Sequence, residues 1–412
     1  MNAYLVIILF ILLADYLLDF IVDYLNVKNI DPALPPEFNG FYDAAKYRTS
    51  QEYLKENTNF GLFSNTFFTV ITILFIMLGG FNLVDLLARH FRQPEIITGL
   101  IFAAIIILGS QLLSLPFSLY GTFVIEEKYG FNRTTVKTFI LDILKGWLLT
   151  ALIGGTAFAI VIWFFARAGA WAWVYCWLAL TAIELFITFM APVVIMPLFN
   201  KFIPLPAGEL RSAIEDYARK QGFKMKGIFT MDGSRRSTKS NAFFTGFGRY
   251  RRIVLFDTLI EKHTVAELVS VLAHEIGHYK KKHIFKQLIL SLAVSALMLF
   301  VLSRFINNPG LFRAFRMQEL SIYASLFFFG FLFSPLNLFF SILGNYLSRR
   351  YEYEADAYAV TTTGQPEAMV TALKKLTVHN LGNLTPHPLN VFLHYSHPPV
   401  LERIRAIKSL GG

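Results

Sequence analysis

The stretch Thr264-Val-Ala-Glu-Leu-Val-Ser-Val-Leu-Ala-His-Glu-Ile-Gly-His278 decides how the central part of this chain folds and what it binds. Thr264 followed by Glu267 is a capping-box pattern, which marks the start of a helix. On that helix His274 and His278 lie one turn apart on one face, so both imidazoles can reach one tetrahedral metal ion. Glu275 lies off that line, where it can act as general base on a water without being a ligand.

The alternative for this stretch is a pair of surface histidines beside a glutamate. With nine histidines in the chain, a chance match is about a one-in-a-hundred event. The setting also favours a site, because the helix is expected to continue through Lys280, Lys281 and Lys282 into a membrane span. A solvated surface helix would not usually continue in this way.

A third zinc ligand is expected in the segment 349–359, which leaves the last apolar run as a helix. Two histidines with one glutamate are a standard catalytic ligand set with an open position for water. Glu352 is the predicted ligand, and Asp356, one turn on, is expected to accept an N–H from a ligating histidine. Glu354 lies about 200° round the helix from Glu352 and is expected to point elsewhere. Without the histidine motif, this segment would be an ordinary charged juxtamembrane helix.

Another candidate histidine lies near the C-terminus, in the stretch His394-Tyr-Ser-His-Pro-Pro399. A histidine here could donate a hydrogen bond to the oxyanion of a tetrahedral intermediate, worth a few kcal/mol in such sites. From the residues alone, a structural loop histidine is an equally good interpretation.

The composition indicates a membrane protein. Of the 412 residues, 55% are hydrophobic and only 16% are charged, which is unusual for a soluble protein. A span needs roughly 20 apolar residues, and seven runs qualify: 4–23, 61–86, 97–120, 146–166, 171–195, 285–306 and 321–346. The first contains Asp15, Asp19 and Asp23 and no small-residue cleavage site, so we expect it to stay in the mature protein.

Charge predicts the orientation and the partners. Lys and Arg gather in the segments 24–60, 121–145 and 196–284 and after 347, so the positive-inside rule places the N-terminus outside and the long hydrophilic segment in the cytosol. The chain has a formal net charge of +10. The excess basic residues lie beside the spans, which favours anionic lipid headgroups over nucleic acid as their partner. Cys176 is the only cysteine; it excludes an internal disulfide, and its expected role is packing.

The hydrophilic segment is expected to contain a small sheet. A helix over 209–220 precedes apolar runs at 227–231, 241–247 and 252–260, with a turn at 248–250, which predicts a β-hairpin or a three-stranded sheet. We therefore divide the chain into spans one to five with cytosolic loops, a zinc peptidase part with the histidine helix, spans six and seven, and a C-terminal part with the third ligand: 1–199, 200–284, 285–347 and 348–412.

Together these motifs resemble a known family. Besides the zinc motif, the matching stretches are Phe123-Val-Ile-Glu-Glu-Lys-Tyr-Gly-Phe-Asn132, Pro197-Leu-Phe-Asn-Lys-Phe202, Ser240-Asn-Ala-Phe243, Tyr351-Glu-Tyr-Glu-Ala-Asp356 and Tyr395-Ser-His-Pro398. Over most of its length the chain is similar to the CAAX prenyl endopeptidases of the a-factor-converting type, which are seven-span zinc metalloproteases. A heat-shock membrane metalloprotease family shares the zinc motif but is shorter, with fewer spans.

This resemblance implies a mainly α polytopic membrane protein. Seven transmembrane helices would surround a large chamber, with a small α+β, gluzincin-like zinc metallopeptidase domain on the cytosolic side. It implies zinc ligands His274, His278 and Glu352 and the base Glu275. It places a substrate-contacting asparagine at Asn241, beside Ala242, and an active-site histidine at His397. Arg403 is expected to face the C-terminal carboxylate of a substrate, with a surface or lipid-facing arginine as the alternative.

The expected function is removal of the C-terminal tripeptide of isoprenylated CAAX substrates by attack of a zinc-bound water, with one Zn²⁺ per chain. The expected partners are prenylated peptides and membrane lipids, without nucleic acid, and the expected state is a monomer. The favoured location is a bacterial inner membrane, or the endoplasmic reticulum or inner nuclear membrane of a eukaryote. Two alternatives stay open: a lipid-independent quality-control zinc protease, and a non-catalytic membrane scaffold or transporter.

Overall fold

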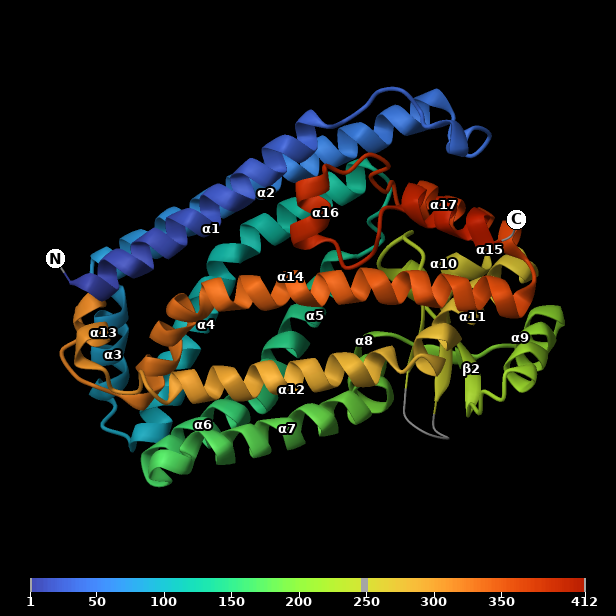
Figure 1. Cartoon of the computed structure of the whole chain (residues 1–412). Coiled ribbons are helices and arrows are strands. Elements are labelled where there is room, and N and C mark those ends of the chain that lie inside the picture. The colour runs from blue at the N-terminus through green and yellow to red at the C-terminus, as the bar shows by residue number, and fades with distance from the viewer. Residues whose placement is uncertain (1, 246–250, 411–412) are drawn as a thin grey trace.

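A computed structural model describes residues 2–245 and 251–410, and these residues form a long helical body with a mixed α and β end (Figure 1). Among the described residues, seven helical stretches are long and apolar enough to cross a membrane, which confirms the expected number. They are Ala3–Lys28, Ala44–Met77, Glu95–Glu126, Val136–Arg167, Gly169–Phe199, His283–Leu302 and Ile322–Thr363. Within them lie α1 (Ala3–Lys28), α2 (Ala44–Met77), α4 (Glu95–Tyr120), α5 (Val136–Leu149), α6 (Gly155–Arg167), α7 (Ala172–Met190), α8 (Met196–Phe199), α12 (His283–Leu302) and α14 (Ile322–Thr363).

The second span differs from the expected range 61–86. Helix α2 ends at Met77, and a separate short helix, α3 (Gly80–His90), follows Gly79. Gly79 has a φ of +76°, a conformation that glycine adopts without steric penalty. A Cβ at Gly80 would lie 2.3 Å from the Phe75 ring. The two glycines therefore end the span and let the chain turn back.

Within the described part of the chain the sheet has four strands, where two or three were expected. They are β1 (Phe202–Pro204), β2 (Gly227–Met231), β3 (Ala242–Thr245) and β4 (Arg252–Phe256), in the order β1-β2-β4-β3. Strand β2 runs parallel to β4, and the other two pairs are antiparallel. The apolar run expected to continue to residue 260 ends at Phe256, where α10 (Asp257–Ile260) begins. The turn expected at 248–250 lies outside the described residues.

Helices cover the sheet and complete the peptidase end. The helix α9 (Glu209–Lys220) forms as predicted, and α11 (Val265–Lys280) starts with the predicted capping box at Thr264. Buried Ile214, Ile253, Leu272 and Ile276 pack between these elements, and apolar burial of this kind contributes roughly 25 cal/mol per Å². The remaining helices are α13 (Pro309–Ala314), at the opposite end of the molecule, and α15 (Pro366–His379), α16 (Pro388–His394) and α17 (Val400–Leu410) (Figure 1).

The expectation that the histidine helix continues into a span is wrong. Helix α11 ends at Lys280, and α12 begins at His283. Between them Lys282 has a φ of +57°, a left-handed conformation that interrupts helical geometry. In contrast, α14 is one helix of 42 residues, and it runs from the end near α13 through the membrane body into the peptidase end (Figure 1).

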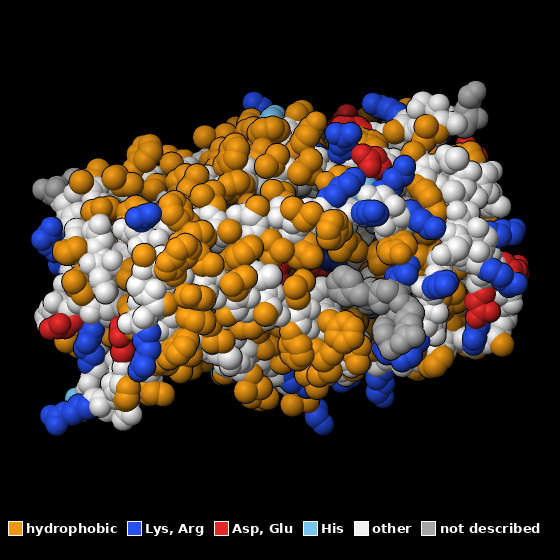
Figure 2. All heavy atoms as spheres, turned by 60° about the horizontal axis from the view of Figure 1, so that its bottom comes forward, with side chains coloured by type: hydrophobic (Ala, Val, Ile, Leu, Met, Phe, Trp, Pro, Cys, Tyr) orange, Lys and Arg blue, Asp and Glu red, His pale blue; other side chains and the backbone are white. Residues whose placement is uncertain are grey.

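The surface of the helical body is apolar. Figure 2 shows hydrophobic side chains spread over it, with most charged side chains gathered toward the two ends. This distribution fits a bilayer around the body. Cavities lie between the spans, and one of 620 Å³ is lined by residues of α1, α2, α3, α4 and α14. The single large chamber stays a prediction. Cys176 is fully buried among apolar side chains, as its predicted packing role requires.

Candidate active site

The structure brings His274, His278 and Glu352 into one cluster. The Nε2 atoms of the two histidines lie 3.0 Å apart. Glu352 Oε1 lies 3.2 Å from His278 Nε2, and Glu352 Oε2 lies 3.4 Å from His274 Nε2. Three ligand atoms of a tetrahedral zinc site are separated by roughly 3.3 Å, given Zn–N bonds of about 2.0–2.1 Å. The three side chains therefore have the spacing of a zinc ligand set.

Close helix packing sets this spacing. The ligands come from α11 and α14, which cross where Gly277 faces Ala355. A Cβ on Gly277 would lie 3.1 Å from the Cα of Ala355 and 3.2 Å from its carbonyl oxygen. Ala355 and Ala359 are fully buried at the contact. Small residues on both helices let the backbones approach, and this approach brings Glu352 to the histidines.

Asp356 lies where the sequence predicted. Its Oδ1 lies 2.8 Å from His274 Nδ1, so the carboxylate accepts the N–H of that ring and leaves Nε2 as the free lone pair. Both side chains are buried. Although burial lowers the pKa of His274, the hydrogen bonds to Asp356 and Glu352 outweigh it and raise the pKa to about 9. The negative surroundings of this imidazole favour a bound cation.

Arg403 lies within the site, beside two of its carboxylates. Its side chain is buried, so it is neither a surface nor a lipid-facing arginine. The guanidinium donates to both oxygens of Asp356, at 2.7 and 2.8 Å, and lies 3.1 Å from Glu352 Oε2. The guanidinium is therefore hydrogen-bonded to one carboxylate of the site and ion-paired with a second. This geometry favours a positioning role over contact with a substrate carboxylate.

The site contains two residues that sequence reasoning missed, His283 and Glu354. His283 Nδ1 lies 3.0 Å from Nδ1 of the ligand His278, and His283 Nε2 lies 3.1 Å from Glu354 Oε2. In a continuous helix a residue five positions after His278 would lie about 140° away around the axis. The left-handed Lys282 returns His283 to the cluster, and a motif-based analysis has no signal for that turn.

Glu275 and His397 complete the group around the ligands. Glu275 accepts no hydrogen bond and forms no ion pair within the described ranges, and burial raises the pKa of its carboxyl group above the usual value. His397 Nε2 lies 3.4 Å from Glu352 Oε1, and its Nδ1 lies 3.0 Å from Ser396 Oγ. A free carboxylate and an imidazole are therefore available for proton transfer and for hydrogen bonding beside the metal position.

Asn241 and Ala242 lie where β3 begins. Asn241 directly precedes the strand and is exposed. Its Oδ1 accepts from the N–H of Ala242 at 2.8 Å, which leaves the side-chain NH₂ as donor. Strand β3 is at the edge of the sheet and packs against α11. An extended peptide could therefore pair with β3 next to the metal-binding helix.

The stretches around Glu126 and Asn200 hold the segment that leads into β3. Lys239 Nζ lies 2.9 Å from Glu126 Oε2 and donates to Tyr53 at 2.8 Å. Arg236 forms a bidentate pair with Asp142 and donates to Asn200 at 2.9 Å. These contacts tie the membrane spans to the backbone just before Asn241.

The residues fit a zinc ion by their atoms and by their charge. Glu352 Oε2 is buried and accepts no hydrogen bond in the described part of the chain. Three carboxylates, Glu275, Glu352 and Asp356, face one guanidinium, that of Arg403, so with neutral imidazoles the site carries a net charge of −2. A divalent cation compensates this charge, and imidazole nitrogens with a carboxylate are ligands that zinc prefers.

Comparisons with known proteins agree with this geometry. Residues 23–201 match the family model described as CAAX prenyl protease N-terminal, five membrane helices, and residues 204–410 match peptidase family M48. CAAX prenyl protease 1 homologs are similar: the one from Arabidopsis thaliana is 37% identical over 93% of each chain. The one from Homo sapiens is 33% identical, over 92% of this chain and 89% of that protein.

A solved structure has the same fold. The crystal structure of S. mikatae Ste24p superposes with a TM-score of 0.93 at 32% sequence identity, covering 99% of each chain. The family matches cover both the membrane spans and the peptidase end, where the zinc ligands lie. This chain therefore belongs to peptidase family M48, with the N-terminal membrane domain of the CAAX prenyl proteases, and is a membrane zinc metalloendopeptidase.

Proposed function

We propose that this protein removes the C-terminal tripeptide of isoprenylated CAAX substrates. The observation that carries the proposal is the zinc ligand set beside an open edge strand, in a chain that is similar over nearly its full length to proteins named CAAX prenyl protease 1. A non-catalytic scaffold or transporter does not require metal ligands, a free carboxylate and an edge strand in one place, so this combination favours an enzyme.

The chain's own residues divide the work of hydrolysis. Zinc, when bound, supplies Lewis-acid polarisation of the scissile carbonyl and makes water more acidic. Glu275 takes the proton of the attacking water and passes it to the leaving amine. His397 donates a hydrogen bond to the oxyanion. The substrate pairs with β3 by main-chain hydrogen bonds, and the NH₂ of Asn241 donates to one of its carbonyls.

The test compares a farnesylated CAAX peptide with its unprenylated twin, using wild type and Glu275→Ala in detergent. We expect one zinc per chain in both proteins, farnesyl-dependent cleavage by wild type, and loss of turnover in Glu275→Ala by at least 10²-fold, in the usual range for a general base. Equal cleavage of both peptides would favour the lipid-independent quality-control protease. An active Glu275→Ala enzyme would contradict the mechanism.

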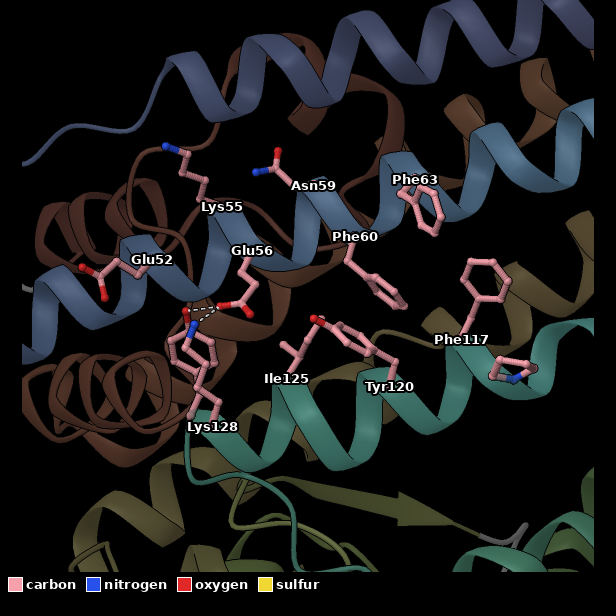
Figure 3. A pocket seen from close by; sticks show the side chains of 12 residues that line it. Glu52, Lys55, Glu56, Asn59, Phe60, Phe63, Phe117, Tyr120, Ile125 and Lys128 are labelled. Atoms are coloured by element: carbon pink, nitrogen blue, oxygen red, sulfur yellow. Dashed lines mark hydrogen bonds and ion pairs between the residues drawn. The ribbon is translucent and has the colours of Figure 1, made fainter.

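We infer that the isoprenyl chain lies in a groove between α2 and α4 (Figure 3). This groove has a volume of 760 Å³. Its aromatic half is lined by Phe60 and Phe63 of α2 and by Phe117 and Tyr120 of α4, which face one another across it. Its other half is charged, with Lys128 2.6 Å from Glu56. An apolar chain with a polar end suits such a groove.

The groove is connected to the peptide site. Tyr129 at its charged end donates to Glu56 at 2.7 Å and packs edge-on against Tyr53, with ring centroids 4.9 Å apart. Tyr53 in turn accepts from Lys239, two residues before Asn241. A lipid in the groove and a peptide on β3 would therefore contact the two ends of one chain of contacts, in which the ring contact between Tyr129 and Tyr53 joins two sets of hydrogen bonds.

Phe63→Ser tests the groove, with Phe186→Ser as control. Both rings are similarly exposed, at 63% and 64%, but Phe186 lies on α7 outside the groove. Loss of apolar contact of about 1–2 kcal/mol should raise KM for the farnesylated peptide roughly five- to thirtyfold in Phe63→Ser only. The unprenylated twin should show no change. Equal KM values in both variants would reject the groove and leave the proposed cleavage untouched.

The orientation and the assembly state are also proposals. The positive-inside rule supports a cytosolic peptidase end, in a bacterial inner membrane or in the endoplasmic reticulum or inner nuclear membrane of a eukaryotic host. One chain supplies all three ligands, which supports a monomer. Because Cys176 is the only cysteine, single cysteines placed on a Cys176→Ser background and labelled with an impermeant thiol reagent test the orientation. Labelling of exposed peptidase positions from outside would overturn it.

A further inference from the structure

A fully buried histidine that is not a ligand connects one zinc ligand to a carboxylate. His283 is 1% exposed, and its ring stacks on Tyr351 with centroids 4.3 Å apart and planes at 11°. Its Nδ1 lies 3.0 Å from His278 Nδ1, and its Nε2 lies 3.1 Å from Glu354 Oε2. Both ring nitrogens of His283 are therefore in hydrogen-bond contact with other members of this group.

With both imidazoles neutral, the contacts allow one consistent placement of protons. Two Nδ1 atoms at hydrogen-bond distance share one proton, so one of them is the donor and the other the acceptor. The carboxylate of Glu354 is an acceptor, so His283 carries its proton on Nε2 and keeps a lone pair on Nδ1. His278 then donates from Nδ1. Its Nε2, which lies 3.0 Å from His274 Nε2, is left as the lone pair that faces the metal position.

We propose that Glu354 and His283 are positioning residues that hold His278 in its zinc-binding tautomer through a Glu354–His283–His278 relay. His274 receives the same support directly from Asp356. Each histidine ligand thus ends on a carboxylate, one directly and the other through a second imidazole. Partners of this kind fix the ring orientation and raise the basicity of the ligand.

The surroundings of His283 place its ring beside His278. The left-handed Lys282 places the ring beside His278, and Tyr351 covers one ring face. Tyr351 and Glu354 both lie on α14, next to the ligand Glu352. The same helix therefore supplies one ligand directly and positions another through Glu354. This inference concerns the zinc site and does not depend on which substrate is cleaved.

The test measures zinc affinity by competition with a fluorescent chelator on the detergent-solubilised full chain. His283→Phe keeps the stacking ring but has no acceptor for His278, so we expect zinc to bind 10- to 100-fold more weakly, the usual loss for such partners. His283→Gln offers an amide oxygen that can accept the His278 proton, so it should recover part of the loss. At saturating zinc, KM should be unchanged in both variants, because neither side chain contacts substrate.

Glu354→Leu and Arg350→Gln form the matched pair. Arg350 lies 3.3 Å from the other oxygen of Glu354 and is largely exposed, so its loss should leave zinc affinity unchanged. Glu354→Leu should weaken zinc binding severalfold or more. Wild-type zinc affinity in a folded His283→Phe protein would overturn the proposal. If His283→Phe does not fold, equal affinities in Glu354→Leu and Arg350→Gln would overturn it.

Discussion

Replacing the buried Arg403 should destabilise the protein far more than replacing its neighbour on the same helix. Arg403→Met leaves Asp356 and Glu352 without the guanidinium that compensates them, and removing one partner of a buried ion pair costs about 3–5 kcal/mol. For a peptidase end of this size each kcal/mol shifts the melting temperature by about 2–4 °C. We therefore expect a drop of roughly 6–20 °C. Arg403→Lys keeps the charge but loses the bidentate geometry, so its melting temperature should lie between those of the wild type and Arg403→Met.

Arg405→Met is the control. Arg405 lies two residues further along α17, is 69% exposed, and approaches Glu37 only at 3.7 Å, so its pair contributes about 0–1 kcal/mol. Melting is followed by circular dichroism at a fixed zinc concentration. Equal melting temperatures for the two variants would refute the electrostatic argument. A selective loss of activity by Arg403→Lys on peptides with a free C-terminus, relative to amidated ones, would restore the predicted contact with a substrate carboxylate.

Three further perturbations follow from the same contacts. Gly277→Ala should separate α11 from α14 by a few tenths of an ångström; overpacking of about 1–3 kcal/mol is partly offset by about 1 kcal/mol of helix propensity. Zinc affinity should fall severalfold by chelator competition, whereas Gly330→Ala, which has open space, should not change it. Burial, Lys262 and Lys46 lower the pKa of His379 to about 4, below about 6.5 in the unfolded chain. The contribution of His379 to stability should therefore be fully present above pH 6.5 and be lost as the pH falls toward 4. In His379→Gln the melting temperature should decrease less over this pH range than in wild type. Parallel plots of melting temperature against pH for the two proteins would contradict the argument. Chelation should lower the melting temperature. If zinc was present at a thousandfold excess over Kd, its removal lowers the free energy of unfolding by about 4 kcal/mol, and added zinc should restore both stability and turnover.

The sequence predicted the elements whose signals are local. Span number follows from run length, the start of α11 from Thr264 and Glu267, and the histidine spacing from helical periodicity. The shared face of Glu352 and Asp356 follows from their spacing of four residues on one helix. Each of these signals is contained within one stretch of chain, where composition and period suffice.

The features that were missed depend on backbone geometry or on contacts between distant segments. No propensity marks Lys282 as left-handed, so the break after α11 and the return of His283 were not foreseen. Gly79 and Gly80 could have suggested the end of the second span, but the hydrophobicity of α3 concealed it. The three residues of β1 are too few for a strand pattern, and the burial of Arg403 depends on the folding of α17 against α14.

The course of α14 has a consequence for how the enzyme is made. Its zinc ligand, Glu352, comes after α12 and after the membrane part of α14, whereas both histidines precede α12. A nascent chain that has emerged only as far as α11 has two imidazoles and no carboxylate to complete the set. The metal site can close only after α12 and the membrane part of α14 have been inserted. Proteolytic activity therefore cannot arise on a half-inserted chain, and a soluble fragment cut between the spans would lack either the histidines or Glu352.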